Sequence, residues 1–208
     1  RAKEAVQKIG VSADELIGLI NTLLDVRKVE EGRMEYQFAK IDLAKMVADV
    51  VELERPVAEG KKLELTLAAP DQPVFINADG EKFKQVIQNL VDNAIKYTPT
   101  ASTGSPQGGF VKVEVRAEGS QEQGTGNKEF RVARVSVSDS GLGVPADLIP
   151  HLFEEFIRDE RVKKEIRGTG LGLYIARKIA EAHGGKMRAE SAGEGKGSTF
   201  SVTVPLAQ

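Results

Sequence analysis

The sequence contains no cysteine and only two histidines, His151 and His183. Without cysteine, disulfides, zinc–thiolate sites and thiol nucleophiles are excluded, and a reducing compartment is favoured. No apolar run approaches the ~18–20 residues that a membrane span needs, and no signal-peptide pattern is present. Neither sign of charge dominates, since 29 Lys and Arg stand against 31 Asp and Glu. A net charge of −2 gives no electrostatic reason to expect nucleic acid or an anionic membrane as a partner.

The composition is that of a soluble globular chain, with 40% hydrophobic and 29% charged residues. At 208 residues it is long enough for one well-buried α/β domain with an appendage, and too short for two full domains. The sequence begins at Arg1 instead of Met, so we expect it to be a piece of a longer protein.

Residues 1–34 are predicted to form a separate helix that ends near Gly32. Its apolar residues alternate spacings of three and four, which is typical of a coiled-coil or helical-bundle seam: Val6, Ile9, Ala13, Leu16, Ile20 and Leu23. One interpretation is a helix packed on its own domain. The other, which we favour, is a bundle surface that awaits a partner helix.

From residue 35 onward the pattern alternates between strands and helices, which predicts a second unit over 35–208. The predicted strands are 36–38, 63–67, 74–77, 110–116, 130–137, 186–191 and 198–204, and the predicted helices are 43–57, 80–97, 145–156 and 170–183. Asp79 is a plausible N-cap for the helix that starts at Gly80. This order predicts an α/β two-layer sandwich with a mixed, mostly antiparallel sheet covered by helices on one face.

The predicted helix from Gly80 carries Asn89, Asn93 and Lys96 within an arc of roughly 60°. Amide oxygens suit Mg²⁺, and a lysine neutralises phosphate charge, so the trio fits a metal and phosphate site. Taken alone, these residues would be ordinary on an exposed helix face.

Two glycine-rich segments follow strands or open helices. Residues 135–143 run from a strand into Asp139 and then Gly141 and Gly143, where an aspartate could accept a hydrogen bond from an exocyclic amine. A tight turn capped by Asp139 is an equally good interpretation. Residues 167–173 are rich in glycine and open the next helix, so their free N–H groups could cradle phosphate. The charged segment 157–168 before them suggests a lid or simply a solvated loop.

Taken together, these motifs make the sequence resemble the ATP-binding catalytic domain of two-component sensor histidine kinases over residues 36–205. The similarity lies in Asn89-Leu-Val-Asp-Asn93-Ala-Ile-Lys96-Tyr97, Asp139-Ser-Gly141-Leu-Gly143, Leu152-Phe153-Glu-Glu-Phe156-Ile-Arg158 and Gly168-Thr-Gly170-Leu-Gly172-Leu, which match the N, G1, F and G2 boxes. Residues 1–34 resemble the second helix of that family's dimerisation and phosphoacceptor hairpin. The fold implied is the Bergerat, or histidine-kinase-type, ATPase fold.

The resemblance assigns roles at the matching positions. Asp139 would bind the adenine amino group, beside Gly141, Gly143 and Thr199. Asn93 would hold Mg²⁺ with Asn89 in support, Lys96 and Arg158 would contact phosphates, and Tyr97 would line the nucleotide. Phe153 and Phe156 would anchor the lid. The segment that hinges the lid and meets the phosphates would be Gly168, Thr169, Gly170, Leu171 and Gly172.

The resemblance also implies ATP and Mg²⁺ as cofactors and a cytoplasmic location, either on its own or as the cytoplasmic part of a membrane-bound sensor. The partners it implies are a phosphoacceptor-histidine helix of the same or a partner subunit, a response-regulator receiver domain, and a second kinase copy through the bundle helix. His151 and His183 match neither the position nor the surroundings of the family's acceptor histidine. We therefore expect phosphoryl transfer to a histidine outside this chain.

Three rival functions remain at this point. A gyrase-type ATPase would carry a glutamate where this chain has Asn89, and an amide cannot take a proton from water. An anti-sigma serine kinase does not account for the leading bundle helix. A decayed nucleotide-sensing module would retain binding without transfer, which the complete set of boxes argues against.

Overall fold

A computed structural model describes residues 2–100, 108–121, 129–159, 161, 166 and 168–207 of the chain. The loop predictions for 101–107 and 122–128, and most of the predicted lid between 160 and 167, lie outside these residues. The helices are α1 (Ala2–Glu30), α2 (Leu43–Gly60), α3 (Gly80–Tyr97), the short 3-10 helix η2 (Ile149–His151) and α4 (Gly172–Ala182). The strands are β1 (Phe38–Asp42), β2 (Glu64–Ala68), β3 (Phe75–Asp79), β4 (Phe110–Gln121), β5 (Glu129–Asp139), β6 (Lys186–Glu190) and β7 (Ser198–Pro205).

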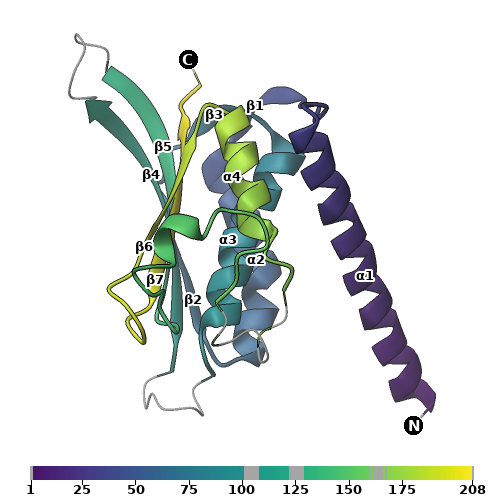
Figure 1. Cartoon of the computed structure of the whole chain (residues 1–208). Coiled ribbons are helices and arrows are strands. Elements are labelled where there is room, and N and C mark those ends of the chain that lie inside the picture. Colours follow the sequence, from purple (N-terminus) through teal and green to yellow (C-terminus); the bar gives the residue numbers. More distant parts are fainter. Residues whose placement is uncertain are drawn as a thin grey trace.

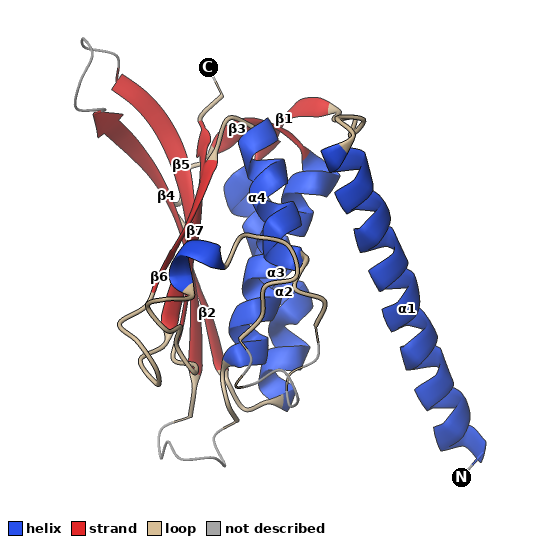
Figure 2. Ribbon diagram, viewed as in Figure 1, coloured by secondary structure: helices blue, strands red, loops and turns tan. Residues whose placement is uncertain are grey.

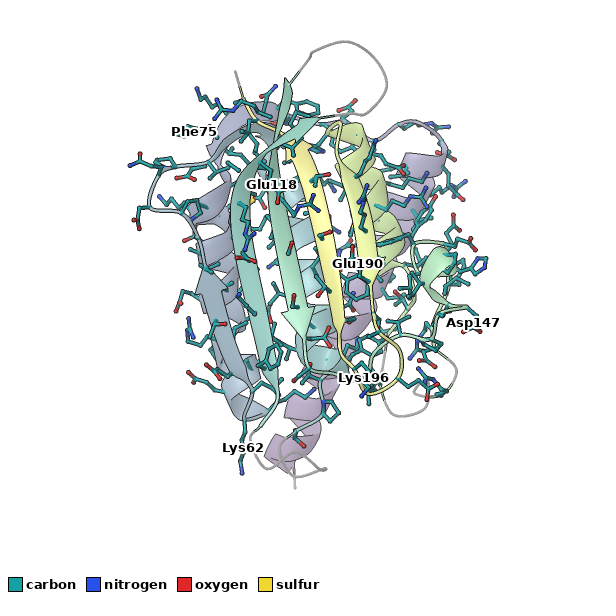
Figure 3. All side chains as sticks on the ribbon, turned by 90° about the vertical axis from the view of Figure 1, so that its left-hand side faces the viewer. Lys62, Phe75, Glu118, Asp147, Glu190 and Lys196 are labelled. Carbon is teal, nitrogen blue, oxygen red and sulfur yellow. The ribbon has the colours of Figure 1, made fainter. Side chains whose placement is uncertain are left out.

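The main sheet has five strands in the order β2-β4-β5-β7-β6. Strand β2 is parallel to β4, and the other neighbouring pairs are antiparallel. Because side chains alternate along a strand, one face of the sheet is apolar, with Val113, Val135 and Val202 buried. Figure 3 views the opposite face of the sheet, which no helix of the described residues covers and on which Glu118 and Glu190 lie.

Helices α2, α3 and α4 pack side by side on the apolar face and form the second layer of the sandwich (Figures 1 and 2). Helix α3 is central because one of its faces is fully apolar: Phe83, Val86, Ile87, Leu90, Val91, Ala94 and Ile95 are buried. Its predicted N-cap is confirmed, since Asp79 Oδ1 accepts a hydrogen bond from the Lys82 N–H at 3.0 Å. The predicted two-layer sandwich with a mostly antiparallel sheet is therefore confirmed.

The predicted helix over residues 145–156 is wrong. This segment forms turns around η2, and most of its N–H bonds reach three residues back, as from Leu148 to Pro145 and from His151 to Leu148, both at 3.0 Å. Pro150 has no N–H, so an α-helical bond is impossible at that position. Leu152 and the neighbouring Phe153 still pack against the core, which explains why the apolar spacing looked helical.

The first strand begins later than predicted, at Phe38 instead of Tyr36. It pairs antiparallel with β3 in a separate two-stranded sheet, with Phe38 opposite Asp79. The Gln37 N–H donates to the Asp79 carboxylate at 2.8 Å and so closes the ladder at this end. A partner 42 residues away in sequence sets the register, and the local pattern around Tyr36 does not contain that information.

Helix α1 stands apart from the other helices along most of its length (Figure 1). Near its C-terminal end Val26 is buried, and Asp25 forms an ion pair with Lys82 of α3 at 3.2 Å. The described residues of the predicted seam, Leu16, Ile20 and Leu23, are open to solvent. The apolar residues Ile17 and Leu24 beside the seam are exposed as well. The seam predictions for Val6, Ile9 and Ala13 concern side chains outside the described set. Among the described residues, no helix combines the length and apolar character that crossing a membrane requires.

Candidate functional site

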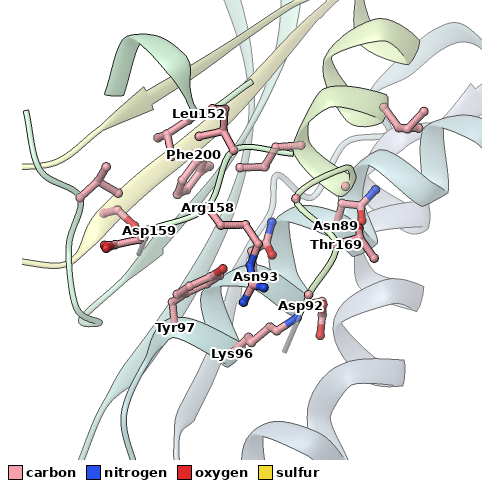
Figure 4. Close-up of a pocket in the computed structure, with 18 of the residues that line it drawn as sticks. Asn89, Asp92, Asn93, Lys96, Tyr97, Leu152, Arg158, Asp159, Thr169 and Phe200 are labelled. Atoms are coloured by element: carbon pink, nitrogen blue, oxygen red, sulfur yellow. The ribbon is translucent and has the colours of Figure 1, made fainter. Parts of the chain in front are cut away.

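A pocket of about 270 Å³ opens between α3, the start of α4 and the ends of β5 and β7. Figure 4 shows polar side chains of α3 on one side of it and Leu152 and Phe200 on the other, with Arg158 extending toward Asn93. The pocket is therefore polar at one end and apolar at the other. A ligand with a flat apolar part and a charged tail fits such a lining.

The polar end is built by the face of α3 that does not enter the core. Asn89, Asn93 and Lys96 lie on this face and line the pocket, as the predicted arc requires. Gly172 begins α4 directly opposite, where a Cβ would lie only 2.9 Å from Asn89 Oδ1. A side chain at this position would crowd the amide, so glycine keeps the first turn of α4 close to α3.

Asp139 ends β5 in the lining of the pocket, and the residue is only 6% exposed. Its Oδ1 accepts the Gly141 N–H at 2.7 Å, and its Oδ2 accepts the Ser198 hydroxyl at 2.5 Å. Burial raises the pKa of Asp139 above its ordinary value of 3.8, while both hydrogen bonds act in the opposite direction. The carboxylate has lone pairs beyond these two bonds with which to accept a ligand donor.

The turn after Asp139 brings β5 against the end of α3. A Cβ at Gly141 would lie 2.5 Å from the Tyr97 carbonyl oxygen, so no side chain fits there. The next residue, Leu142, donates its N–H to that same carbonyl at 3.1 Å. Gly143 follows with a φ of +65° and packs against Gly193. These two glycines shape the turn but do not line the pocket.

Arg158 and Thr169 line the pocket from either end of the predicted lid. Arg158 lies beside Tyr97: burial raises the pKa of that phenol, and a hydrogen bond from Arg158 opposes the rise. Asp159 also lines the pocket, and its ion pair with Arg161 lowers the pKa of the carboxyl. This part of the chain thus adds both a cation and an anion to the lining of the pocket.

Phe153 and Phe156 have different surroundings. Phe153 packs edge-on against Phe200 with a ring-centroid distance of 6.5 Å, and Phe200 lines the pocket. Phe156 is 62% exposed and adopts a φ of +60°, a left-handed conformation that is strained for an aromatic residue. Its N–H donates to the Gly170 carbonyl at 3.1 Å, which links the two ends of the lid segment.

The structure brings most of the predicted site residues together. The pocket is lined by Asn89, Asn93, Lys96, Tyr97, Asp139, Arg158, Gly168, Thr169, Gly170 and Gly172. Leu171 is fully buried in the core instead. Thr199 does not lie beside Asp139 as the resemblance implied, because its hydroxyl pairs with that of Ser138 at 2.9 Å on the uncovered face of the sheet.

Sequence reasoning missed several lining residues. Ser198 and Phe200 flank Thr199 and face the pocket, so the alternation of strand β7 would have identified them once the register was known. Leu148 and Leu152 line the apolar end from the segment that was predicted as a helix. Asp92, Ile157 and Leu173 lie inside the quoted motifs, and Asp159 lies in the predicted lid segment, but none of them was assigned a role. The remaining lining residues carried no signal in their local pattern: Thr22, Gln85, Val144 and Ile175.

His183 has a structural place outside the pocket lining. It is buried, Nε2 accepts the Asp79 N–H at 2.9 Å, and Nδ1 lies 2.7 Å from the Ile179 carbonyl oxygen. The ring is therefore neutral, with its proton on Nδ1. Burial lowers the pKa of His183 from its ordinary value of 6.5, although Ile179 and Asp79 oppose the shift.

This lowered pKa predicts a loss of stability in mild acid. In the unfolded chain His183 takes up a proton as the pH falls through about 6.5, whereas the folded chain resists protonation until a lower pH. The free energy of unfolding should then fall by at most about 1.4 kcal/mol per pH unit from this group, and level off below the folded-state pKa. Denaturant unfolding between about pH 7.5 and 5.5 tests this. A His183→Gln variant with the same pH dependence as the unmodified chain would contradict it.

Comparison with known proteins shows that residues 78–208 match the family described as histidine kinase-, DNA gyrase B- and HSP90-like ATPases. The chain is 31% identical over 195 residues to the sensor histidine kinase WalK of Bacillus subtilis, covering 92% of the chain and 29% of WalK. It is 34% identical over 208 residues to the sensory/regulatory protein RpfC of Xanthomonas campestris, covering 99% of the chain and 27% of RpfC. The chain thus spans under a third of the length of these two relatives.

Solved structures show the same similarity. Full-length ShkA in complex with AMPPNP superposes with a TM-score of 0.74 at 28% identity, covering 95% of the chain and 37% of ShkA. The catalytic domain of the histidine kinase ThkA superposes with a TM-score of 0.63 at 28% identity, covering 81% of the chain and 97% of that domain.

Proposed function

We propose, on the premise that this chain belongs to the family of histidine kinase-, DNA gyrase B- and HSP90-like ATPases, that its pocket binds ATP with Mg²⁺ for phosphoryl transfer to a histidine. The observation that carries the proposal is that Asp139 and the α3 face with Asn89, Asn93 and Lys96 line one and the same pocket. A purine amine at Asp139 and a phosphate tail along α3 would satisfy both groups.

Asp139 would select the base. Its buried carboxylate, held in place by Gly141 and Ser198, would accept the exocyclic N–H of adenine. The apolar side chains of Leu152 and Phe200 would cover the base. Guanine carries an oxygen where adenine carries the amine, so the same carboxylate would repel it.

Asn93 and Asn89 would hold Mg²⁺ together with the phosphates. The described residues contain no cluster of three or more carboxylate, cysteine or histidine ligands that could form a closed metal cage. Mg²⁺ commonly keeps waters and phosphate oxygens as ligands and needs only one or two protein groups. The amide oxygens on α3 fit that requirement, and Lys96 and Arg158 would neutralise phosphate charge.

ATP, when bound, supplies the γ-phosphoryl group, and the residues of this chain orient it toward an incoming imidazole nitrogen. Lys96, Arg158 and the N–H groups before α4 would stabilise charge as the bond to the leaving phosphate breaks and the bond to nitrogen forms. Asn89 stands where a base for water would be needed, and an amide cannot serve as one. We therefore propose histidine kinase chemistry in preference to steady ATP hydrolysis.

The exposed apolar seam of α1 suggests how the acceptor would arrive. A second helix carrying the acceptor histidine would cover Leu16, Ile20 and Leu23, either within one subunit or across a dimer. A response-regulator receiver domain would then take the phosphoryl group. The similarity to sensor kinases supports both the acceptor helix and the receiver domain as partners.

Isothermal calorimetry with ATP and GTP, each with Mg²⁺, tests the proposal. We expect ATP to bind and GTP to bind at least tenfold more weakly, a difference of about 1.4 kcal/mol. Equal affinities, or no binding of ATP by the folded chain, would contradict it.

Asn93→Ala should weaken ATP binding chiefly in the presence of Mg²⁺. The reason is that the variant removes one proposed amide ligand of the metal while leaving the base and phosphate contacts in place. Calorimetry with Mg²⁺ and with a chelator measures both affinities, and Lys84→Ala on the same helix is the matched control. Equal losses with and without Mg²⁺ would point to a packing role for Asn93.

A further inference from the structure

We propose that Lys61, a residue outside the pocket, is a positioning residue that fixes the last turn of α3 and thereby sets Lys96 and Tyr97 for nucleotide binding. The inference rests on the proposed function, which names the ligand. The observation behind it is a single ammonium group that binds three carbonyl oxygens at the end of α3.

The contacts of Lys61 are close and complete. Its Nζ lies 2.6 Å from the Ile95 carbonyl oxygen, 3.1 Å from that of Lys96 and 3.0 Å from that of Thr98. An ammonium has three N–H donors and no acceptor, so each donor has one carbonyl. Hydrogen bonds from a charged donor are about twice as strong as neutral ones.

The end of α3 needs such a donor. The last four carbonyls of a helix have no partner within the helix, and Pro99 directly after Thr98 has no N–H to offer. Ala94 O accepts the Thr98 hydroxyl at 2.7 Å, and Tyr97 O accepts the Leu142 N–H at 3.1 Å. Of the five carbonyls from Ala94 through Thr98, the three that remain are those of Ile95, Lys96 and Thr98, which Lys61 binds.

The position of Lys61 is itself fixed by the end of α2. Its N–H bonds to Val57 and Ala58 carbonyls in the last turn, so Lys61 is the C-cap residue of that helix. Lys62 then takes a φ of +57° and reverses the chain, and the Leu63 N–H returns to Ala58 O at 2.9 Å. Two helix ends are thus joined through one side chain.

The charges around Lys61 link it to the polar end of the pocket. Burial lowers the pKa of its ammonium and the nearby Lys96 adds to that effect, while Asp92 opposes it. Lys96 and Asp92 both line the pocket. Loss of Lys61 would leave the carbonyls on either side of Tyr97 without this donor. The backbone that holds the Lys96 and Tyr97 side chains in the pocket (Figure 4) would then be less firmly fixed.

The test compares Lys61→Met with Lys62→Met. The second variant is the matched control, because it removes the same charge from the next residue, whose side chain is exposed. By calorimetry with Mg·ATP, at a temperature where both variants are folded, we expect Lys61→Met to bind roughly tenfold more weakly. We expect Lys62→Met to stay within about twofold of the unmodified chain.

A double-mutant cycle distinguishes positioning from general destabilisation. If Lys61 acts through Lys96, then Lys61→Met should cost far less in a Lys96→Met background, on the order of twofold. Hydrogen exchange without nucleotide should also show faster exchange of the amides of Ala94–Tyr97 in Lys61→Met than in Lys62→Met. Should Lys61→Met not fold, Lys61→Gln, which keeps two donors without the charge, replaces it with the same expected direction.

An affinity equal to that of the unmodified chain in a folded Lys61 variant would overturn the inference and leave the proposed function intact. An equal loss in both backgrounds would also overturn it, because Lys61 would then act independently of Lys96. Absence of ATP binding by the unmodified chain would instead overturn the proposed function, and the inference with it.

Discussion

Asp139→Asn should lower the affinity for ATP by at least tenfold while leaving the fold intact. The carboxylate is buried and already accepts two hydrogen bonds, from Gly141 and Ser198. In asparagine the amide oxygen can still accept the Gly141 N–H, and the Ser198 hydroxyl can turn to accept from the new NH₂ group. The neighbouring bonds therefore survive, but the acceptor proposed for adenine becomes a donor.

The size of the effect follows from the burial of Asp139. A hydrogen bond to a charged, buried acceptor contributes about 1.5–3 kcal/mol, which corresponds to tenfold or more in affinity. Calorimetry with Mg·ATP measures it, together with circular dichroism to show that the variant is folded. Asp49→Asn, an exposed change of the same kind on α2, should bind as the unmodified chain does. Unchanged affinity in folded Asp139→Asn would remove Asp139 from the site.

The second large effect is an absence of autophosphorylation on histidine. After incubation with γ-labelled ATP, we expect the isolated chain to carry no acid-labile phosphate. His183 is buried at the C-terminal end of α4, and both of its ring nitrogens are engaged by Asp79 and Ile179. It lies about 16 Å from the start of that helix, since eleven residues rise 1.5 Å each.

His151 is the other histidine, and its surroundings are also unsuitable. It lies in η2 and does not line the pocket, and its Nδ1 is 2.9 Å from a Glu154 carboxylate oxygen on the exposed surface. A separate helical fragment that carries an acceptor histidine and pairs with the α1 seam should become labelled in the same mixture. Acid-labile label on the chain itself that disappears in His151→Ala or His183→Ala would contradict this prediction.

The sequence predicted the layers of this fold well because periodicity is a local property. Helix α3 was predicted with the bounds that the structure shows, since its apolar face, its Asp79 cap and the Pro99 beyond its end all lie within one short stretch. The helix over 145–156 was predicted wrongly because apolar spacing outweighed Pro150 in that reasoning.

The candidate site was predictable where side chains sit on one regular element. The α3 face with Asn89, Asn93 and Lys96 is an example, because helix geometry alone brings these residues together. Thr199 and Ser198 are the opposite case. Which of two neighbouring hydroxyls meets Asp139 depends on the pairing of β7 with β5, and strand register is set by contacts distant in sequence.

Lys61 could not have been identified from the sequence. It comes at the end of α2, 34 residues before Ile95, and a lysine after a helix is an ordinary surface residue in most chains. Only the packing of α2 beside α3 brings its ammonium to the three carbonyls. The same holds for Thr22, which reaches the pocket from α1 and has no motif around it.

Strand β5 keeps its two ends far apart: one end lies at the pocket and the other lies at a distant edge of the molecule. Asp139 ends the strand at the pocket, and Glu129 begins it about 33 Å away, since ten steps rise about 3.3 Å each. The β4–β5 pair extends beyond the rest of the sheet at the Glu129 end (Figure 1). We therefore expect that a fluorescent label attached between Gln121 and Glu129 would leave the Asp139 carboxylate at the other end of β5 in place.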